Sequence, residues 1–240
     1  MSASKYAYVT LLTSDAYLPG ALVWAESLRA AKTPHDLAIL VTPETVTHAA
    51  LEQINRVFDR VVSVPTIRSQ DVGNLQLLGR RELDITFTKL HVWNPDTLPY
   101  ERVIFMDADT LVLKPIDELF DAVAGDVAFA AAPDVGWPDC FNSGVFVTKP
   151  EADLFASLVE YAHTNGSFDG GDQGLLNAYF NSWASGSPRP GQTSPTAARL
   201  PFQYNVTPSP VYSYLPAYVY YKADIKVVHF IGPNKPWTFE

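Results

Sequence analysis

The segment VIFMDADTLVLKP, at residues 103–115, places two carboxylates between two apolar runs. The first run has the length and hydrophobicity of a buried strand. Asp107 and Asp109 follow it, separated only by Ala108, and a second apolar run begins at Leu111. An unpaired buried carboxylate is very costly, and hard oxygens at the end of a strand suit Mg²⁺ or Mn²⁺. The segment therefore predicts a metal site, against the alternative that Asp107 caps a turn and Asp109 is solvated.

The composition excludes several classes of protein. With 240 residues, 47% of them hydrophobic and 18% charged, the chain fits one compact α/β domain over residues 1–240 with no separate second domain. A net charge of -9 without a basic run argues against a nucleic-acid partner. The single cysteine, Cys140, allows no internal disulfide and favours a reducing compartment, the cytoplasm. We expect no signal peptide and no membrane span, because no apolar stretch is long enough.

The first part of the chain alternates strand and helix patterns. Strands are predicted at 6–12, 37–41 and 61–64, with helices at 18–31 and from Thr42-Pro43 onward. This order indicates a doubly wound parallel sheet that binds ligands at the carboxyl ends of its strands, where the two acids also lie. The first strand is followed by neither the glycine pattern of a dinucleotide-binding fold nor a phosphate-binding P-loop.

A small group of cationic and aromatic residues precedes the two acids. Arg80, Arg81 and Lys89 form a basic cluster, with Lys89 on a helix predicted at 85–93. The cluster is either a solvated face or a clamp for a diphosphate. Tyr17 either stacks on a base or packs as an ordinary core aromatic.

Short polar side chains mark two further segments. Asn142 and Ser143 are predicted in a turn before a strand restarts at Val145, where they either face a cavity or only cap the turn. Asp169 and Asp172 flank two adjacent glycines, which allow the backbone to approach a ligand closely. Asp172 could be only a helix N-cap, but the pair together favours a site for a hydroxyl-rich ligand.

The last segment, KVVHFIGPNKPW, predicts another strand that carries His229. A lone histidine is usually structural, yet His229 ends an apolar run as Asp107 follows one, so we predict that they share a metal. The sequon at Asn205 is followed by Pro208 and nothing suggests secretion, so we discount it as a glycosylation site.

Taken together, five segments resemble the glycogenin family: FMDADTLVLKP, PDVGWPDCFNSGVF, GSFDGGDQGLLN, VYSYLPA and KVVHFIGPNKPW. The resemblance runs from about the first strand to the last residue. It implies a single GT-A type domain with a Rossmann-like, mostly parallel sheet flanked by helices. It also implies a retaining glucosyltransferase that uses UDP-glucose to glucosylate its own tyrosine and extends a short α-1,4-glucan primer for glycogen synthesis.

The resemblance implies roles for individual residues. Mn²⁺, with Mg²⁺ as an alternative, would be held by Asp107, Asp109 and His229. The donor would contact the backbone or side chains of Leu11, Thr13, Ser14, Tyr17, Arg80, Lys89, Asp107, Ala108, Asp109, Asn142, Ser143, Asp169, Gln173, Gly232 and Lys235. The catalytic set would be Asp172, nearest the anomeric carbon, with Lys89 and the self-modified Tyr212. Ser14 departs from the family, which usually has Asn there, so a contact with uracil or ribose is expected to be weaker.

The partners implied are UDP-glucose, the protein's own glucan chain and a second copy in a homodimer. The family's long tail, which ends in a glycogen synthase-binding segment, is absent from this sequence, so that partner is expected only for a longer protein. A related transferase with a separate acceptor is an alternative, against which VYSYLPA argues. A non-catalytic sugar-nucleotide binder is another, against which the intact metal set and Asp172 argue.

Overall fold

The centre of the molecule is a seven-stranded sheet in the computed structural model, which describes residues 4–79, 81–136, 138–208, 213–232 and 234–238. The strand order is β3-β2-β1-β4-β7-β6-β8. The strands are β1 (Tyr6–Leu12), β2 (Asp36–Val41), β3 (Arg60–Ser63), β4 (Arg102–Met106), β6 (Phe129–Pro133), β7 (Phe141–Thr148) and β8 (Ala197–Arg199).

The sheet has a parallel half and a mixed half. Strands β3, β2, β1 and β4 pair in parallel, as the alternating strand and helix patterns predict. Beyond β4, the pairings of β7 with β4 and with β6 are antiparallel, while β6 and β8 pair in parallel. The predicted Rossmann-like, mostly parallel sheet flanked by helices is confirmed.

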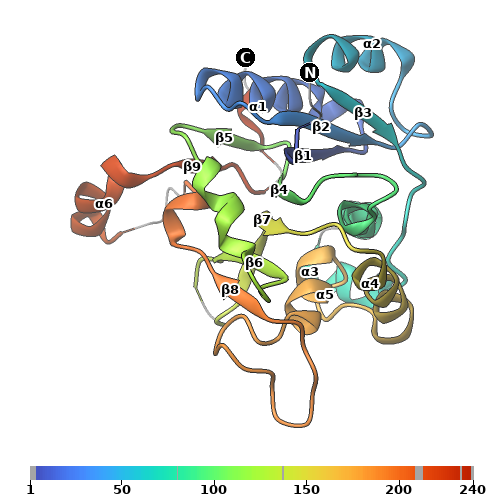
Figure 1. The fold of residues 1–240 in the computed structure, drawn as a ribbon, viewed down its shortest axis with the longest axis vertical. Coiled ribbons are helices and arrows are strands. Elements are labelled where there is room, and N and C mark those ends of the chain that lie inside the picture. The colour runs from blue at the N-terminus through green and yellow to red at the C-terminus, as the bar shows by residue number, and fades with distance from the viewer. Residues whose placement is uncertain (1–3, 80, 137, 209–212, 233, 239–240) are drawn as a thin grey trace.

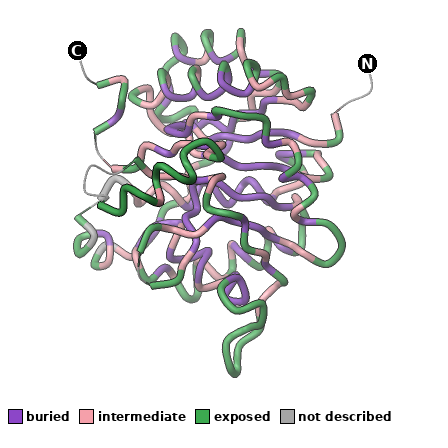
Figure 2. Tube along the Cα trace, turned by 90° about the vertical axis from the view of Figure 1, so that its left-hand side faces the viewer, coloured by how far each residue is buried: buried purple, intermediate pink, exposed green. Residues whose placement is uncertain are grey.

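Helices cover both faces of the sheet because successive strand residues point to opposite sides (Figure 1). On one side, Tyr8 packs in a core with α1 (Leu18–Ala30), α2 (His48–Val57) and the 3-10 helix η3 (Asp117–Val123). On the other, Val9 packs with the 3-10 helix η2 (Arg81–Trp93), α4 (Ala152–Asn165) and α5 (Asp172–Tyr179). Figure 2 shows the buried residues concentrated along the strands, with an exposed loop at residues 184–193 extending away from them.

A second, two-stranded sheet joins distant parts of the chain. Strand β5 (Thr110–Val112) pairs antiparallel with β9 (Val227–His229), with Thr110 opposite His229. This register brings the end of β9 beside the turn that carries the two acids.

The remaining helices are short and connect these elements. They are η1 (Asp15–Tyr17), α3 (Val72–Leu78), η4 (Phe202–Tyr204), α6 (Leu215–Tyr221), η5 (Lys222–Asp224) and η6 (Pro236–Thr238). Among the described residues, no helix has the length and apolar character needed to cross a membrane.

One predicted element boundary is wrong. Helix α2 begins at His48 and not at Thr42-Pro43, because Thr47 caps it with a side chain that accepts from the Ala50 N–H. Thr42 instead closes a turn by accepting from the N–H groups of Thr45 and Val46.

The structure also corrects two predictions around the site. Asn142 and Ser143 lie within strand β7, which begins at Phe141, and not in a turn before it. The helix predicted at 85–93 is a 3-10 helix that begins at Arg81. Helix α3, which precedes η2, was not among the predicted elements.

Candidate active site

A cavity of about 560 Å³ gathers nearly all the predicted site residues near the carboxyl ends of β1 and β4. Those that line it are Leu11, Thr13, Ser14, Tyr17, Lys89, Asp107, Ala108, Asp109, Asn142, Ser143, Asp169, Asp172, Gln173, His229, Gly232 and Lys235. The predicted Arg80 and Tyr212 lie outside the described residues.

The two acids sit on a tight turn between β4 and β5. The Asp107 N–H donates to the Gly144 carbonyl on β7, 2.8 Å away. The Asp107 carbonyl accepts from both the N–H and the hydroxyl of Thr110, at 3.1 and 2.8 Å. The Asp109 carbonyl accepts from the Phe230 N–H at 3.0 Å. These backbone bonds fix the turn, so that both carboxylates enter the cavity.

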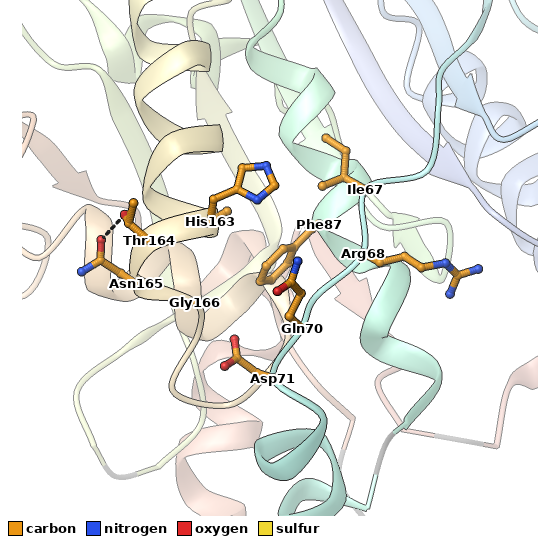
Figure 3. Close-up of a pocket in the computed structure, with 10 residues that line it drawn as sticks. Ile67, Arg68, Gln70, Asp71, Phe87, His163, Thr164, Asn165 and Gly166 are labelled. Carbon is orange, nitrogen blue, oxygen red and sulfur yellow. Dashed lines mark hydrogen bonds between the residues drawn. The ribbon is translucent and has the colours of Figure 1, made fainter.

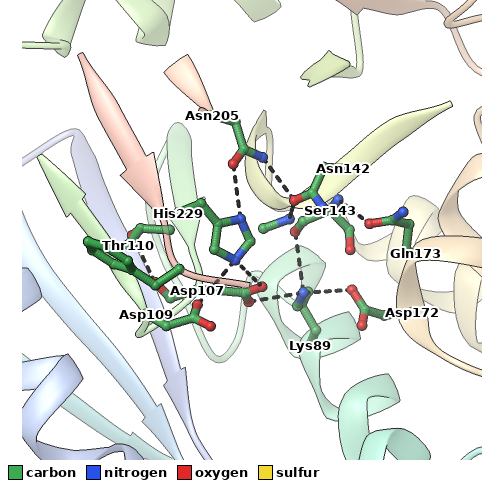
Figure 4. Close-up of polar contacts among 12 residues, drawn as sticks. Lys89, Asp107, Asp109, Thr110, Asn142, Ser143, Asp172, Gln173, Asn205 and His229 are labelled. Carbon is green, nitrogen blue, oxygen red and sulfur yellow. Dashed lines mark hydrogen bonds and ion pairs between the residues drawn. The ribbon is translucent and has the colours of Figure 1, made fainter. Parts of the chain in front are cut away.

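Asp107, Asp109 and His229 offer three ligand atoms that all lie within 4.8 Å of one another (Figure 4). His229 Nε2 is 3.2 Å from Asp109 Oδ1 and 3.9 Å from Asp107 Oδ2. Two carboxylate oxygens and an imidazole nitrogen are a donor set suited to a divalent cation. The residues present can therefore hold one metal ion.

Lys235 supplies a positive charge on the other side of Asp109. Its ammonium lies 2.5 Å from Asp109 Oδ2 and donates to the Phe230 carbonyl at 2.8 Å. Burial alone would raise the pKa of Asp109, but the hydrogen bond and charge of His229 and the charge of Lys235 lower this pKa to about 2. Asp109 is therefore a stable carboxylate, as a metal ligand requires.

Lys89 lies between two acids on the opposite side of the cavity. Its ammonium is 2.6 Å from Asp172 Oδ2 and 3.1 Å from Asp107 Oδ1, and it donates to the Ser143 carbonyl at 3.3 Å. Burial would lower the pKa of Lys89, but the two carboxylates raise it above its usual value. Lys89 is a permanent cation in contact with both acids.

Asp169 and Asp172 have different surroundings. Asp172 is the first residue of α5, and the N-cap is Gly171. Its backbone N–H donates to Thr86, which leaves the carboxylate directed at Lys89 (Figure 4). Asp169 accepts from the Ser167 hydroxyl and the Gly171 N–H. Burial raises the pKa of Asp169.

Two residues missed by the sequence analysis organise the polar wall of the cavity. Asp134 accepts from Gln173 Nε2 at 2.6 Å and from Asn142 Nδ2 at 3.4 Å. Asn205 contacts both His229 and Asn142. The sequence at Asn205 showed only a sequon, which says nothing about a buried amide, and no pattern singled out Asp134.

The predicted nucleoside end of the cavity is formed by the segment after β1. Ser14 caps η1 by accepting from the Ala16 N–H. Lys235 Nζ lies 5.4 Å from the centre of the Tyr17 ring, and Trp237 makes a T-shaped contact with that ring. The indole of Trp237 donates to the Ala16 carbonyl, which ties the segment after β9 to the segment after β1.

A smaller cavity of about 230 Å³ lies between residues 67–71 and the end of α4 (Figure 3). Its lining includes Arg68, Asp71, Phe87 and His163, and none of the predicted site residues.

The model of the family described as "Glycosyl transferase family 8" matches residues 8–240. The chain is 48% identical over 233 residues to Glycogenin-1 of Oryctolagus cuniculus, covering 97% of this chain and 66% of that protein. It is 44% identical over 240 residues to Glycogenin-2 of Homo sapiens, covering 100% of this chain and 45% of that protein. The chain thus spans less than two thirds of the length of each.

Solved structures share the fold at low sequence identity. The galactosyltransferase LgtC, in complex with donor and acceptor sugar analogs, has a TM-score of 0.66 at 18% identity, over 96% of this chain and 89% of that one. The glycosyltransferase GlyE of Streptococcus pneumoniae has a TM-score of 0.64 at 20% identity, over 97% of this chain and 57% of that one. These similarities confirm the expected GT-A type fold.

Proposed function

Because the chain belongs to glycosyl transferase family 8, we propose that it is a glycogenin-type, Mn²⁺-dependent retaining glucosyltransferase with UDP-glucose as donor. It glucosylates its own tyrosine and extends a short α-1,4-glucan on it. Residues 1–240 form its catalytic domain, which acts in the cytoplasm. A glycogen synthase partner is proposed only for a longer form of the protein.

One observation supports this proposal most. A single cavity is lined by the three residues that could hold a metal and by the Lys89–Asp172 ion pair. Asp107, Asp109 and His229 would bind the ion. A divalent cation there would neutralise charge on the diphosphate as the bond to the sugar breaks. Lys235, whose ammonium contacts Asp109 Oδ2, would add a second positive charge near the leaving group.

The protein groups at the sugar end define the reaction that we propose. The bond between the anomeric carbon and the β-phosphate oxygen breaks, and a bond to the acceptor oxygen forms on the same face of the sugar. Asp172 stabilises the positive charge that develops at the anomeric carbon. Lys89 fixes the position of the Asp172 carboxylate through the 2.6 Å ion pair. The acceptor proton leaves with the diphosphate or a nearby base.

Asn142, Ser143, Asp169 and Gln173 would bind the glucosyl group. The Gln173 side chain is already fixed at both ends, since its Oε1 accepts from the Ser143 N–H and its Nε2 donates to Asp134. Fixed polar groups of this kind suit the recognition of sugar hydroxyls, because they need no reordering on binding. Leu11, Thr13, Ser14 and Tyr17 would hold the uridine, with Gly232 and Arg80 near the phosphates or sugar.

The acceptor is proposed to be Tyr212, and the protein is proposed to act as a homodimer. Helix α6 follows this position and exposes Leu215, Tyr218 and Val219 at the periphery of the molecule (Figure 1). A second copy of the chain would cover this apolar surface and bring one subunit's tyrosine toward the other's cavity.

The intact mass of the protein before and after incubation with UDP-glucose and Mn²⁺ tests the proposal. Steps of one hexose on the protein itself are expected. Transfer to an added maltoside without any gain in protein mass would instead indicate an enzyme with a separate acceptor. No transfer to either would leave a sugar-nucleotide binder.

A further inference from the structure

A chain of hydrogen bonds around His229 determines which ring nitrogen carries the proton. It begins at the Gly144 N–H, which donates to Asn142 Oδ1 at 2.9 Å. Because a backbone N–H can only donate, this contact fixes the Asn142 oxygen as an acceptor. The Asn205 group 2.9 Å from the same oxygen must therefore be its amide nitrogen, Nδ2.

The orientation of Asn205 then sets the tautomer of His229. With Nδ2 directed at Asn142, Asn205 Oδ1 faces His229 Nδ1 at 3.0 Å (Figure 4). An amide oxygen only accepts, so Nδ1 carries a hydrogen and donates it. When the ring is neutral, the lone pair is on Nε2, the nitrogen that faces Asp109 and Asp107.

We propose that Asn205 is a positioning residue that holds His229 in its metal-binding tautomer and orientation. This inference rests on the proposed metal site of the transferase. A ligating imidazole needs a partner for its other nitrogen, which fixes the ring and makes the lone pair more available. Asn205 supplies that partner. Asn142 fixes the orientation of the Asn205 amide, with its oxygen toward His229.

Backbone contacts around the two residues also hold Asn205 and His229 next to each other. The His229 N–H donates to the Val206 carbonyl at 2.9 Å, so the residue after Asn205 is bonded directly to the histidine's own backbone. The Asn205 side chain is buried. Gly144 provides room, since a Cβ there would lie 2.1 Å from His229 Cε1 and 2.9 Å from Asn142 Oδ1.

The test is donor-free binding of Mn²⁺, measured by calorimetry on the whole chain. Asn205→Ala removes the acceptor for Nδ1–H and is expected to weaken Mn²⁺ binding by about 10- to 100-fold. Asn205→Asp keeps an acceptor for Nδ1–H, but its second oxygen would face Asn142 Oδ1, so it should recover only part of that loss. Asn181→Ala is the matched control. Asn181 is also a buried asparagine, but it bonds to Ala178, Thr193 and Arg189 and does not line the cavity.

A spectroscopic readout separates positioning from a general loss of structure. Electron spin echo measurements on bound Mn²⁺ detect a coordinated imidazole through its nitrogen. At saturating Mn²⁺, wild type and Asn205→Asp should show this coupling, and Asn205→Ala should show it weakened or absent. Should Asn205→Ala fail to fold by circular dichroism, Asn142→Ala gives a second arm. It leaves Asn205 in place but frees its amide to turn, so a smaller loss in the same direction is expected.

The positioning role would be overturned if folded Asn205→Ala and Asn142→Ala variants bound Mn²⁺ as wild type does, with the imidazole coupling intact. That result would leave the proposed function standing. Wild-type protein that binds no Mn²⁺ would overturn the proposed metal site and this inference together.

Discussion

Lys89 and Asp172, 83 positions apart in the sequence, form a buried ion pair of 2.6 Å in the wall of the large cavity. Asp172 is the first residue of α5 and Lys89 lies on η2, so the ion pair joins these two helices. Because Asp172 is buried, its carboxylate needs a partner, and Lys89 is that partner.

Asp172→Asn should impair chemistry more than binding. A group that acts mainly on the charge developing in the transition state lowers turnover when it is lost, with little change in ground-state affinity. Calorimetry with UDP-glucose and Mn²⁺ is expected to give near-normal binding beside severely reduced transfer. A folded variant that fails to bind the donor would make Asp172 a donor ligand instead.

Asp109→Asn should reduce Mn²⁺-dependent transfer by on the order of 10²-fold or more. The substitution keeps the shape of the side chain but removes the charge that faces both His229 and Lys235. Asp139→Asn is the control, because Asp139 pairs with Arg199 in an exposed salt bridge and does not line the cavity. If Asp109→Asn transferred glucose at the wild-type rate with Mn²⁺, Asp109 would not be a metal ligand.

Gly144→Ala should weaken metal binding although it adds only one methyl group. The new Cβ would lie 2.1 Å from His229 Cε1, so the imidazole would have to move. Gly73→Ala in α3 is the matched control, since a Cβ there meets nothing within 4 Å. Titration of both variants with Mn²⁺ should show a loss only for Gly144→Ala. Equal affinities would mean that the ring can shift without consequence.

Tyr212→Phe should abolish self-glucosylation and spare transfer to a free maltoside. A phenol is a good nucleophile once its proton, with a pKa of ~10, is removed, and phenylalanine has no oxygen that could attack. Peptide mass mapping after UDP-glucose treatment locates the hexose. Tyr214, whose side chain is exposed, is the competing acceptor. Hexose on Tyr214 in the wild-type protein would move the assignment by two positions.

Stability should fall at alkaline pH because of Tyr8. Burial and a hydrogen bond to Asp117 raise the pKa of Tyr8 far above its usual value. Above about pH 10 the unfolded chain ionises this phenol and the folded chain does not, so the free energy of unfolding falls by up to about 1.4 kcal/mol per pH unit.

Urea unfolding of wild type and Tyr8→Phe between about pH 8 and 11 checks this expectation. The variant loses a hydrogen bond at neutral pH but should show a shallower decline above pH 10. Tyr100→Phe is a second comparison, since burial and Asp36 also raise the pKa of Tyr100. Parallel curves for all three proteins would contradict the prediction.

Local patterns predicted the parallel half of the sheet well. Strand β1 matches its predicted range, and β2 and β3 differ from theirs only at their ends, because apolar runs and turn residues mark them clearly. The predicted start of α2 was wrong because Pro43 is a common helix-start signal. The actual cap is Thr47, whose role depends on its hydrogen bonds to Ala50 and Asp15. The resemblance to a family supplied the site residues that no local pattern could rank.

Asn205 and Asp134 show what sequence reasoning could not reach. Their importance lies in contacts with Asn142, His229 and Gln173, which are between 8 and 63 positions away. A short amide or carboxylate in a loop gives no periodic signal, so only the folded arrangement distinguishes these residues from ordinary turn residues.

The pairing of β5 with β9 has a consequence for how the protein is made. The acids at 107 and 109 leave the ribosome long before His229 and Lys235, the latter 126 positions after Asp109. A nascent chain that ends before β9 already contains every strand of the large sheet but neither of these two partners. Contacts between such distant positions form slowly, because a long loop must close first. During synthesis, the large sheet can therefore assemble before β9 emerges, and the two acids meet His229 and Lys235 only once those residues have left the ribosome.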